Sequence, residues 1–291
     1  MGFLEFTIKI ILPILSALLL LFVLYAFVVK PRKRTPLLLK RLAKYRYAHR
    51  GLHSDENNAP ENTLKAFSLA ASAGFGIELD VHLSRDGTLV VMHDDSLMRT
   101  CGVDKLVSQM TVEELSEIRV GGTDEKVPLF SEVLSLVDGR VPLLIELKVD
   151  NRNYNQLCEK LCEALCDYKG EYCIESFDPR AIGYLKRHAR EIVRGQLAVE
   201  CDFKDKAPDK PARIFAARLL LNFISRPDFI AYSFDGLKKP YASLPIFIWR
   251  PTVFVWTVRT AKDMERAEAL GYSVIFENFM PDSPTKGENG K

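Results

Sequence analysis

The sequence lacks an excess of charge of either sign. Its 40 basic and 38 acidic residues give a formal net charge of +2, and the basic residues are spread along the chain. This balance gives no general attraction to a polyanion, so nucleic acid is not expected as a partner, and any affinity for phosphate must come from a local site. Because 47% of the 291 residues are hydrophobic, the chain can form a large folded domain, which excludes disorder as its main state.

A zinc-binding pattern is also missing. Cys158, Cys162 and Cys166 repeat every four residues, but no second pair of cysteines or histidines accompanies them. A structural zinc site usually needs such a second pair. We interpret the three thiols as small apolar side chains on one face of a helix.

Charged residues are absent from Ile10 to Val29, a stretch of twenty residues. An α-helix of about this length crosses a bilayer core of roughly 30 Å. The stretch stays bulky to its end and has no small-x-small cleavage site, which indicates that residues 1–30 are an uncleaved transmembrane anchor rather than a signal peptide. Basic residues crowd its C-terminal side, so we expect a single-pass membrane protein whose main domain is cytoplasmic.

The two segments that flank the main domain are polar or basic. Residues 31–44 are predicted to be a basic juxtamembrane linker, in which Leu37, Leu38, Leu39 and Leu42 lie among Lys40, Arg41 and Lys44. This pattern is typical of a short helix on a membrane surface, and a plain linker is an equal alternative. Residues 283–291 are polar, and we expect a disordered tail.

Between these segments, strand-like and helical patterns alternate over residues 45–282. Such alternation indicates βα units around a parallel sheet. No glycine-rich dinucleotide motif follows the first strand, so the pattern favours an α/β fold of the TIM (β/α)₈ barrel type over a doubly wound sheet. The eight expected strands are Tyr45–His49, Gly76–Leu83, Val141–Leu147, Tyr172–Ser176, Ile192–Val199, Phe229–Ser233, Thr252–Val258 and Ser273–Phe276.

The alternation is interrupted after the second strand. Residues 84 to about 140 hold a turn, a short strand at 88–92, a capping box that begins at Thr111 and a helix from Ser131, which predicts a small insertion on the barrel. Capping residues elsewhere predict helix starts after Thr63, Asp178 and Thr260.

Carboxylates cluster on the expected strands. Glu78 and Asp80 are two residues apart, so both project from one side of the second strand, and Glu146 ends the third. Burying three carboxylates together without a cation is unfavourable because they repel one another and lose their hydration. A divalent cation removes this cost, and a site made of oxygen ligands suits Mg²⁺ or Ca²⁺.

Basic groups and imidazoles follow the same strands. His49 and Arg50 end the first strand, His93 follows the hairpin, and Lys148 follows the third strand. Arg50 and Lys148 supply positive charge for an anionic phosphate diester. His49 and His93 are candidates for general base and general acid. His82, His53 and His188 are weaker candidates, and a lone strand-end histidine is more often structural.

The order of these motifs resembles the glycerophosphodiester phosphodiesterase family over residues 45–282. The matching motifs are Ala48–Gly51, Ala59–Thr63 with Ala66-Phe67, Ile77–Val81, Asp86-Gly87, Val90–Asp94, Leu97–Thr100 and Ile145–Lys148, with later landmarks at Ser176–Asp178 and Val255–Val258. Residues 276–282 match only loosely, which leaves the preference for the leaving group open.

The resemblance implies a TIM barrel with a small inserted subdomain, a divalent cation, and hydrolysis of glycerophosphodiesters to glycerol 3-phosphate and an alcohol. It implies these roles: catalysis by His49 and His93, metal binding by Glu78, Asp80 and Glu146, phosphate contact by Arg50 and Lys148, and a pocket wall at Trp256.

Several alternatives stay open at this point. Either the glycerol 2-hydroxyl or water is the nucleophile, and either histidine is the base. The same site on a membrane-anchored chain also fits a lysophospholipase D acting on lysophospholipids. A barrel without activity that serves as a membrane-bound interaction module is a third hypothesis. The head group and the oligomeric state are not predicted.

Overall fold

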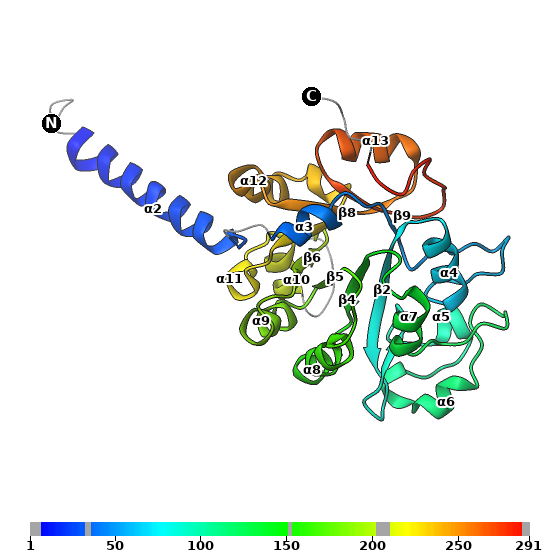
Figure 1. The fold of residues 1–291 in the computed structure, drawn as a ribbon. Coiled ribbons are helices and arrows are strands. Elements are labelled where there is room, and N and C mark those ends of the chain that lie inside the picture. The colour runs from blue at the N-terminus through cyan, green and yellow to red at the C-terminus, as the bar shows by residue number, and fades with distance from the viewer. Residues whose placement is uncertain (1–6, 33–35, 151–152, 202–209, 287–291) are drawn as a thin grey trace.

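Eight parallel strands close into a barrel in the computed structural model, which describes residues 7–32, 36–150, 153–201 and 210–286 (Figure 1). The predicted TIM barrel and its eight strands are confirmed. A ninth strand, β3 (Leu89–Val91), pairs antiparallel with β2 as the predicted hairpin. The barrel strands are β1 (Tyr47–Ala48), β2 (Gly76–Leu83), β4 (Leu143–Leu147), β5 (Tyr172–Ser176), β6 (Arg194–Ala198), β7 (Phe229–Ser233), β8 (Thr252–Val258) and β9 (Ser273–Phe276).

Helices follow most of the strands and cover the outside of the barrel (Figure 1). Thr63, Thr111, Asp178 and Thr260 each accept a backbone N–H at a helix start, as predicted. The helices are η1 (Thr7–Ile11), α2 (Leu12–Val29), α3 (Leu37–Leu42), α4 (Leu64–Ser72), α5 (Met98–Cys101), η2 (Val107–Gln109), α6 (Val112–Ser116), α7 (Phe130–Val137), α8 (Tyr154–Leu165), α9 (Pro179–His188), α10 (Lys210–Ala217), α11 (Asn222–Ser225), η3 (Gly236–Lys238), α12 (Pro240–Trp249) and α13 (Ala261–Ala269).

The strand register places the acidic residues at one level of the barrel. Asp80 of β2 pairs with Glu146 of β4, and Glu146 pairs with Glu175 of β5. Alternate residues such as Leu79 and Ile145 belong to the hydrophobic core beneath the outer helices. Because side chains alternate along a strand, the acidic residues face the barrel interior.

The amino ends of the strands are closed by α3. Leu39 and Leu42 are fully buried against Tyr47, Phe229 and Phe254 inside the barrel. Of the two alternatives for residues 31–44, the short helix is present, but Leu39 and Leu42 face the barrel core rather than a membrane surface, whereas Leu37 is 71% exposed. Lys33 and Arg34 of this segment lie outside the described residues.

The predicted insertion has a small core of its own. Val90, Met92, Leu97 and Leu115 form part of a separate buried cluster between β3 and residue 127. The helix expected from Ser131, α7, instead packs in the main core beside α4. The insertion is thus shorter than the predicted range of 84–140.

Part of the predicted tail is ordered. Arg46 donates a hydrogen bond to the carbonyl of Ser283 at 2.8 Å, and the backbone of Lys286 donates to Lys44 at 2.9 Å. Residues 283–286 therefore pack beside the start of β1, while 287–291 lie outside the described residues.

The segment Thr7–Val29 is long and apolar enough to cross a membrane, with a mean hydropathy of 2.8 over its apolar window. Both a membrane span and a signal sequence have this length and composition. The end of this helix is held by the barrel: Asn222 donates to the carbonyl of Val29 at 2.9 Å, Arg226 to that of Phe27 at 2.7 Å, and Trp249 to that of Ala26 at 3.0 Å.

The packing inside the barrel requires glycine at position 195, because any side chain there would meet a buried ring. A Cβ added there would lie 2.1 Å from the ring of Phe229. We expect Gly195→Ala to lower the free energy of unfolding by about 1–3 kcal/mol because the buried ring must shift. Thermal or urea unfolding of the full chain measures this loss. Adding Phe229→Leu should recover part of it, and an unchanged melting temperature in Gly195→Ala would contradict the packing argument.

Candidate active site

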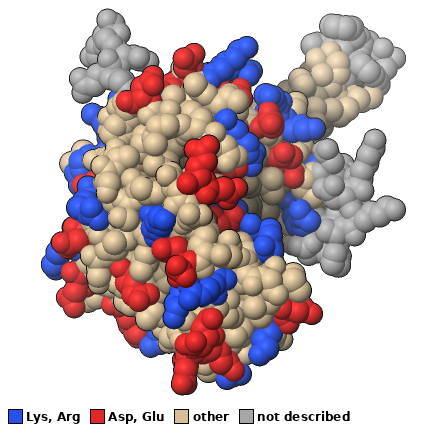
Figure 2. Space-filling model, turned by 90° about the vertical axis from the view of Figure 1, so that its right-hand side faces the viewer, with Lys and Arg blue, Asp and Glu red and all other residues tan. Residues whose placement is uncertain are grey.

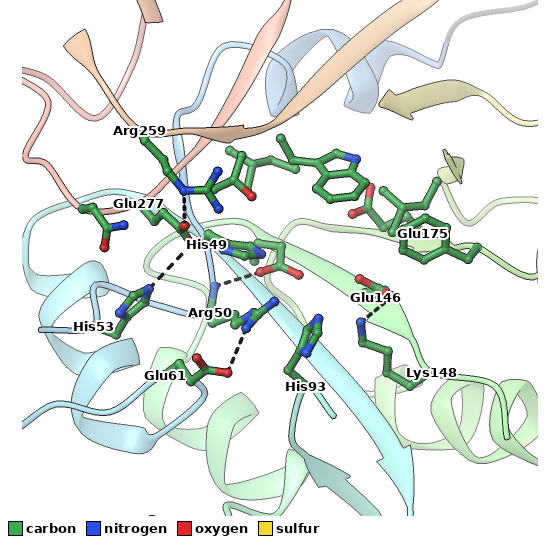
Figure 3. A pocket seen from close by; sticks show the side chains of 17 residues that line it. His49, Arg50, His53, Glu61, His93, Glu146, Lys148, Glu175, Arg259 and Glu277 are labelled. Atoms are coloured by element: carbon green, nitrogen blue, oxygen red, sulfur yellow. Dashed lines mark hydrogen bonds and ion pairs between the residues drawn. The ribbon is translucent and has the colours of Figure 1, made fainter. Parts of the chain in front are cut away.

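A cavity of about 560 Å³ opens at the carboxyl ends of the barrel strands. Of the predicted site residues, His49, Arg50, Glu78, His93, Glu146, Lys148 and Trp256 line it, whereas Asp80 lies buried beneath it. Acidic and basic side chains intermingle around a hollow on the face in Figure 2, and the labelled site residues converge in Figure 3. The structure thus brings the predicted residues together from separate strands.

Three glutamates form a buried acidic cluster in the cavity. Glu78, Glu146 and Glu175 each place one carboxylate oxygen within 4.8 Å of the others. Glu175 is 1% exposed, and its Oε2 has no hydrogen-bond partner within the described part of the chain. A buried charge without a partner is costly. The cluster therefore calls for a cation or for bound protons.

Asp80 is bound by cationic and amide groups instead. Lys148 Nζ lies 3.0 Å from Asp80 Oδ1 and 2.7 Å from Glu146 Oε1. Asn62 donates to Asp80 Oδ2 at 2.8 Å, and Arg50 Nε lies 3.6 Å away. Asp80 thus lies level with Glu146 in the strand register and beside the two predicted phosphate-binding cations.

These surroundings drive the carboxyl pKa values apart. Burial and the charges of Asp80 and Glu146 raise the pKa of Glu78 well above its usual value, and burial raises that of Glu146 to about 7 although Lys148 opposes the shift. Burial and the neighbouring carboxylates likewise raise the pKa of Glu175. Burial also acts on Asp80, but the charges of Lys148, His93 and Arg50 outweigh it and lower the pKa.

His49 is oriented by the carboxylate of a residue that follows the last strand of the barrel. Its Nδ1 lies 2.5 Å from Oε2 of Glu277, which follows β9. Arg259 donates to the other oxygen of Glu277 at 2.7 Å. Although burial favours its neutral form, these two partners lower the pKa of Glu277 to about 2. The bond holds Nδ1 of His49 and leaves Nε2 for the cavity.

His93 has a similar support. Its Nδ1 lies 2.5 Å from Asp94 Oδ1, and Arg99 donates to Asp94 Oδ2 at 2.5 Å. Arg99 also donates to both oxygens of Glu61, which accepts a further bond from Arg50 at 2.8 Å. Burial lowers the pKa of His93, although the charge of Asp80 opposes the shift. Each predicted catalytic imidazole is thus fixed through Nδ1 by an acid.

The backbone after β1 turns sharply where it forms part of the cavity wall. Arg50 has φ of 56° and Gly51 has φ of 80°. This turn directs the N–H of Arg50 to Glu78 Oε2 at 2.8 Å. A Cβ on Gly51 would come within 2.9 Å of Ala66 and Phe67, so glycine is required where the loop touches α4.

Trp256 and His53 also line the cavity, whereas His82 and His188 do not. Trp256 packs edge-on against Phe177, with ring centroids 5.8 Å apart, and both line the cavity. His53 also lines it. His82 is buried beside the carbonyl of His93, and His188 stacks on Tyr184, so neither lines this cavity.

Sequence reasoning missed four charged residues of the cavity wall: Glu61, Glu175, Arg259 and Glu277. Glu61 lies inside a quoted motif, and Glu175 and Glu277 occupy strand ends. Glu175 could have been found from the pairing of its strand with the strand of Glu146, because this pairing places the two glutamates side by side. Glu277 had no comparable signal, because its partner His49 belongs to the first strand.

Comparison with known proteins identifies the family of this chain. The sequence profile of the glycerophosphoryl diester phosphodiesterase family matches residues 49–233. A glycerophosphodiester phosphodiesterase of Bacillus altitudinis is 40% identical over 262 residues, which cover 82% of this chain and 96% of that protein. A lysophospholipase D of Rattus norvegicus is 34% identical over 155 residues, or 47% of each chain.

A solved structure has the same fold. A phosphodiesterase of Oleispira antarctica, determined with the product sn-glycerol-3-phosphate, superposes with a TM-score of 0.68 and 22% identity over 82% of this chain and 94% of that one. The fold, the motifs and the long match to the Bacillus enzyme agree. This chain therefore belongs to the glycerophosphoryl diester phosphodiesterase family and is an enzyme of the glycerophosphodiester phosphodiesterase class.

Proposed function

We propose that the enzyme hydrolyses glycerophosphodiesters to glycerol 3-phosphate and an alcohol, with a divalent cation and with His49 and His93 as acid and base. The observation that carries this proposal is the convergence of two acid-supported imidazoles and a buried acidic cluster on one cavity. The product bound in the Oleispira structure supports the substrate class.

Glu78, Glu146 and Glu175 are the residues that would hold the cation. Oxygens bound to one Mg²⁺ or Ca²⁺ ion lie at most about 5 Å apart, since metal–oxygen distances are about 2.0–2.6 Å, and the three oxygens meet this limit. The unpartnered Oε2 of Glu175 fits the same role. Asp80, which pairs with Glu146 in the strand register, remains a proposed ligand. A bound divalent ion polarises the phosphoryl oxygens and offsets their charge.

Arg50 and Lys148 supply the positive charge that would bind the anionic diester. Their heads line the cavity beside His93 and the acidic cluster. A phosphate between them would exchange some of their carboxylate contacts for its own oxygens. These two cations stabilise the charge that gathers on the non-bridging oxygens during the reaction.

Each of the two imidazoles carries out one of the two proton transfers. One Nε2 takes the proton of the glycerol 2-hydroxyl, whose oxygen attacks phosphorus, and the other Nε2 protonates the departing alcohol. Water then opens the cyclic phosphate to give glycerol 3-phosphate. A phosphorus resonance of cyclic glycerol phosphate during turnover separates this route from direct attack by water.

We further propose that Thr7–Val29 is an uncleaved membrane anchor and that residues 36–286 form the cytoplasmic enzyme. The hydrogen bonds from Asn222, Arg226 and Trp249 to the end of α2 support an anchor that stays attached, because cleavage near residue 30 would remove their acceptors. The basic residues after Val29 support the orientation.

Chelation and histidine substitution test the reaction. Release of glycerol 3-phosphate from glycerophosphocholine should fall to background in EDTA and return with Mg²⁺ or Ca²⁺. His49→Ala and His93→Ala should each lower kcat by about 10²-fold or more, whereas His188→Ala, outside the cavity, should leave it unchanged. Release that persists through both treatments refutes the proposal.

Cation binding can be measured apart from turnover. Titration calorimetry of the full chain in detergent should show Glu175→Gln to weaken Ca²⁺ or Mg²⁺ binding at least tenfold, because one charged ligand is lost. Glu163→Gln is the matched control, since the side chain of Glu163 is 61% exposed on α8. Equal affinities for the two variants would remove Glu175 from the cation site.

Membrane attachment has a simple test. Cells that produce the chain should retain it in the membrane fraction after alkaline carbonate extraction, at the uncleaved mass of 33.0 kDa. A soluble product that begins near residue 30 would show that the apolar helix is a leader and not an anchor.

A further inference from the structure

A second, largely apolar cavity of about 490 Å³ lies beside the catalytic one. Its lining comes from the loops after β5 and β6 and from α9, α10 and α11. The apolar part of the lining includes Phe177, Pro179, Val199, Ala216, Leu221 and Ile224, and the charged residues of the lining are Asp178, Arg180 and Arg213. We call this cavity the side groove. Its volume lies within the range of about 300–1,000 Å³ typical of small-molecule sites.

The side groove adjoins the catalytic cavity through Phe177. This residue lines both cavities, is 38% exposed and packs edge-on against Trp256. A molecule that carries its phosphate between His49 and His93 can therefore continue past one aromatic pair into the groove. The acidic rim residue Asp178 is already paired with Arg180 at 2.5 Å, so it does not compete for a charged ligand.

The groove runs along the side of the barrel. Phe177 and Pro179 follow β5 at the catalytic end, whereas Leu221 and Ile224 precede β7 at the amino end. Helix α11, which carries Ile224, also holds the end of α2 through Asn222. Figure 1 shows α9, α10 and α11 on the same side of the barrel as α2. The groove thus extends from the catalytic mouth toward the membrane-anchored end.

We propose that the side groove binds the single acyl chain of a lysophospholipid whose phosphodiester occupies the catalytic cavity, an inference that rests on the proposed function. An apolar groove favours an uncharged hydrocarbon chain because such a chain loses little by leaving water. A neighbouring cavity of about 400 Å³ carries Glu200, Asp235, Arg259 and Asp263 and does not offer this environment.

The reaction route also favours one chain over two. A lysophospholipid acylated at the first glycerol carbon keeps the 2-hydroxyl that the proposed mechanism uses, whereas a diacyl lipid has none. Overall, water adds across the bond between phosphorus and the head-group oxygen. The head-group alcohol leaves with one hydrogen of that water, and the acylated glycerol keeps the phosphate.

Comparison of two substrates tests the groove with the full chain in detergent. The value of kcat/KM should be higher for lauroyl lysophosphatidylcholine than for glycerophosphocholine. Ala216→Phe, which fills the groove, should lower it at least tenfold for the lysolipid and less than twofold for glycerophosphocholine. Leu221→Gln, which keeps the volume but makes the lining polar, should act in the same direction. Ala269→Phe on the exposed face of α13 is the matched control.

Binding provides a readout that does not need turnover. The chain has two tryptophans, so Trp249→Phe leaves Trp256 alone beside Phe177. Lysophosphatidylcholine with a brominated acyl chain should quench Trp256, and Ala216→Phe should reduce that quenching.

Three results would refute acyl-chain binding in the side groove. They are equal losses of kcat/KM for both substrates, unchanged lysolipid turnover in both groove variants, or no quenching of Trp256. Quenching without release of product from either substrate would instead support the groove and refute the proposed function. Normal turnover of glycerophosphocholine without any effect of the acyl chain would refute the groove alone.

Discussion

The burial of several carboxylates at one level of the barrel is the constraint on which the rest of the site depends. The parallel register from β2 to β5 places Asp80, Glu146 and Glu175 side by side, and Glu78 lies one step below. Such a group of charges is unstable in a dry interior unless protons or cations accompany it. Lys148 and Arg50 stabilise Asp80, and the carboxylate oxygens of Glu78, Glu146 and Glu175 lie close enough together to suit a metal ion.

The same constraint organises the edge of the cavity. Both imidazoles are held through Nδ1, one by Glu277 and the other by Asp94. The supporting acids are in turn held by Arg259 and Arg99. Each histidine is thus fixed from behind and lines the cavity. In the proposed mechanism, this fixed arrangement lowers the cost of aligning the reacting groups.

Much of the fold and of the site could be predicted from the sequence because the signals were local. Apolar strands of fixed length, capping residues and paired polar residues at strand ends all depend on neighbours within a few positions. Asp80 and Glu146 were found in this way, and the strand register then placed them together.

The residues that could not be predicted depend on closure of the barrel. Leucines among basic residues at 37–42 read equally well as a membrane-surface helix, and only the closed barrel gives Leu39 and Leu42 an interior to fill. Glu277 has no acidic or basic partner nearby in sequence, since β9 meets β1 only when the ring closes. The order of Ser283–Lys286 likewise comes from contacts with the segment before β1.

The attachment of α2 at the amino ends of the strands has a consequence for how the enzyme meets its substrate. The catalytic mouth lies at the other end of the barrel, so under the proposed anchoring its opening faces the aqueous layer and not the lipid surface. Molecules released from the bilayer reach this opening, whereas lipids that stay embedded do not. The proposed anchor would thus keep the enzyme where such released molecules are most concentrated.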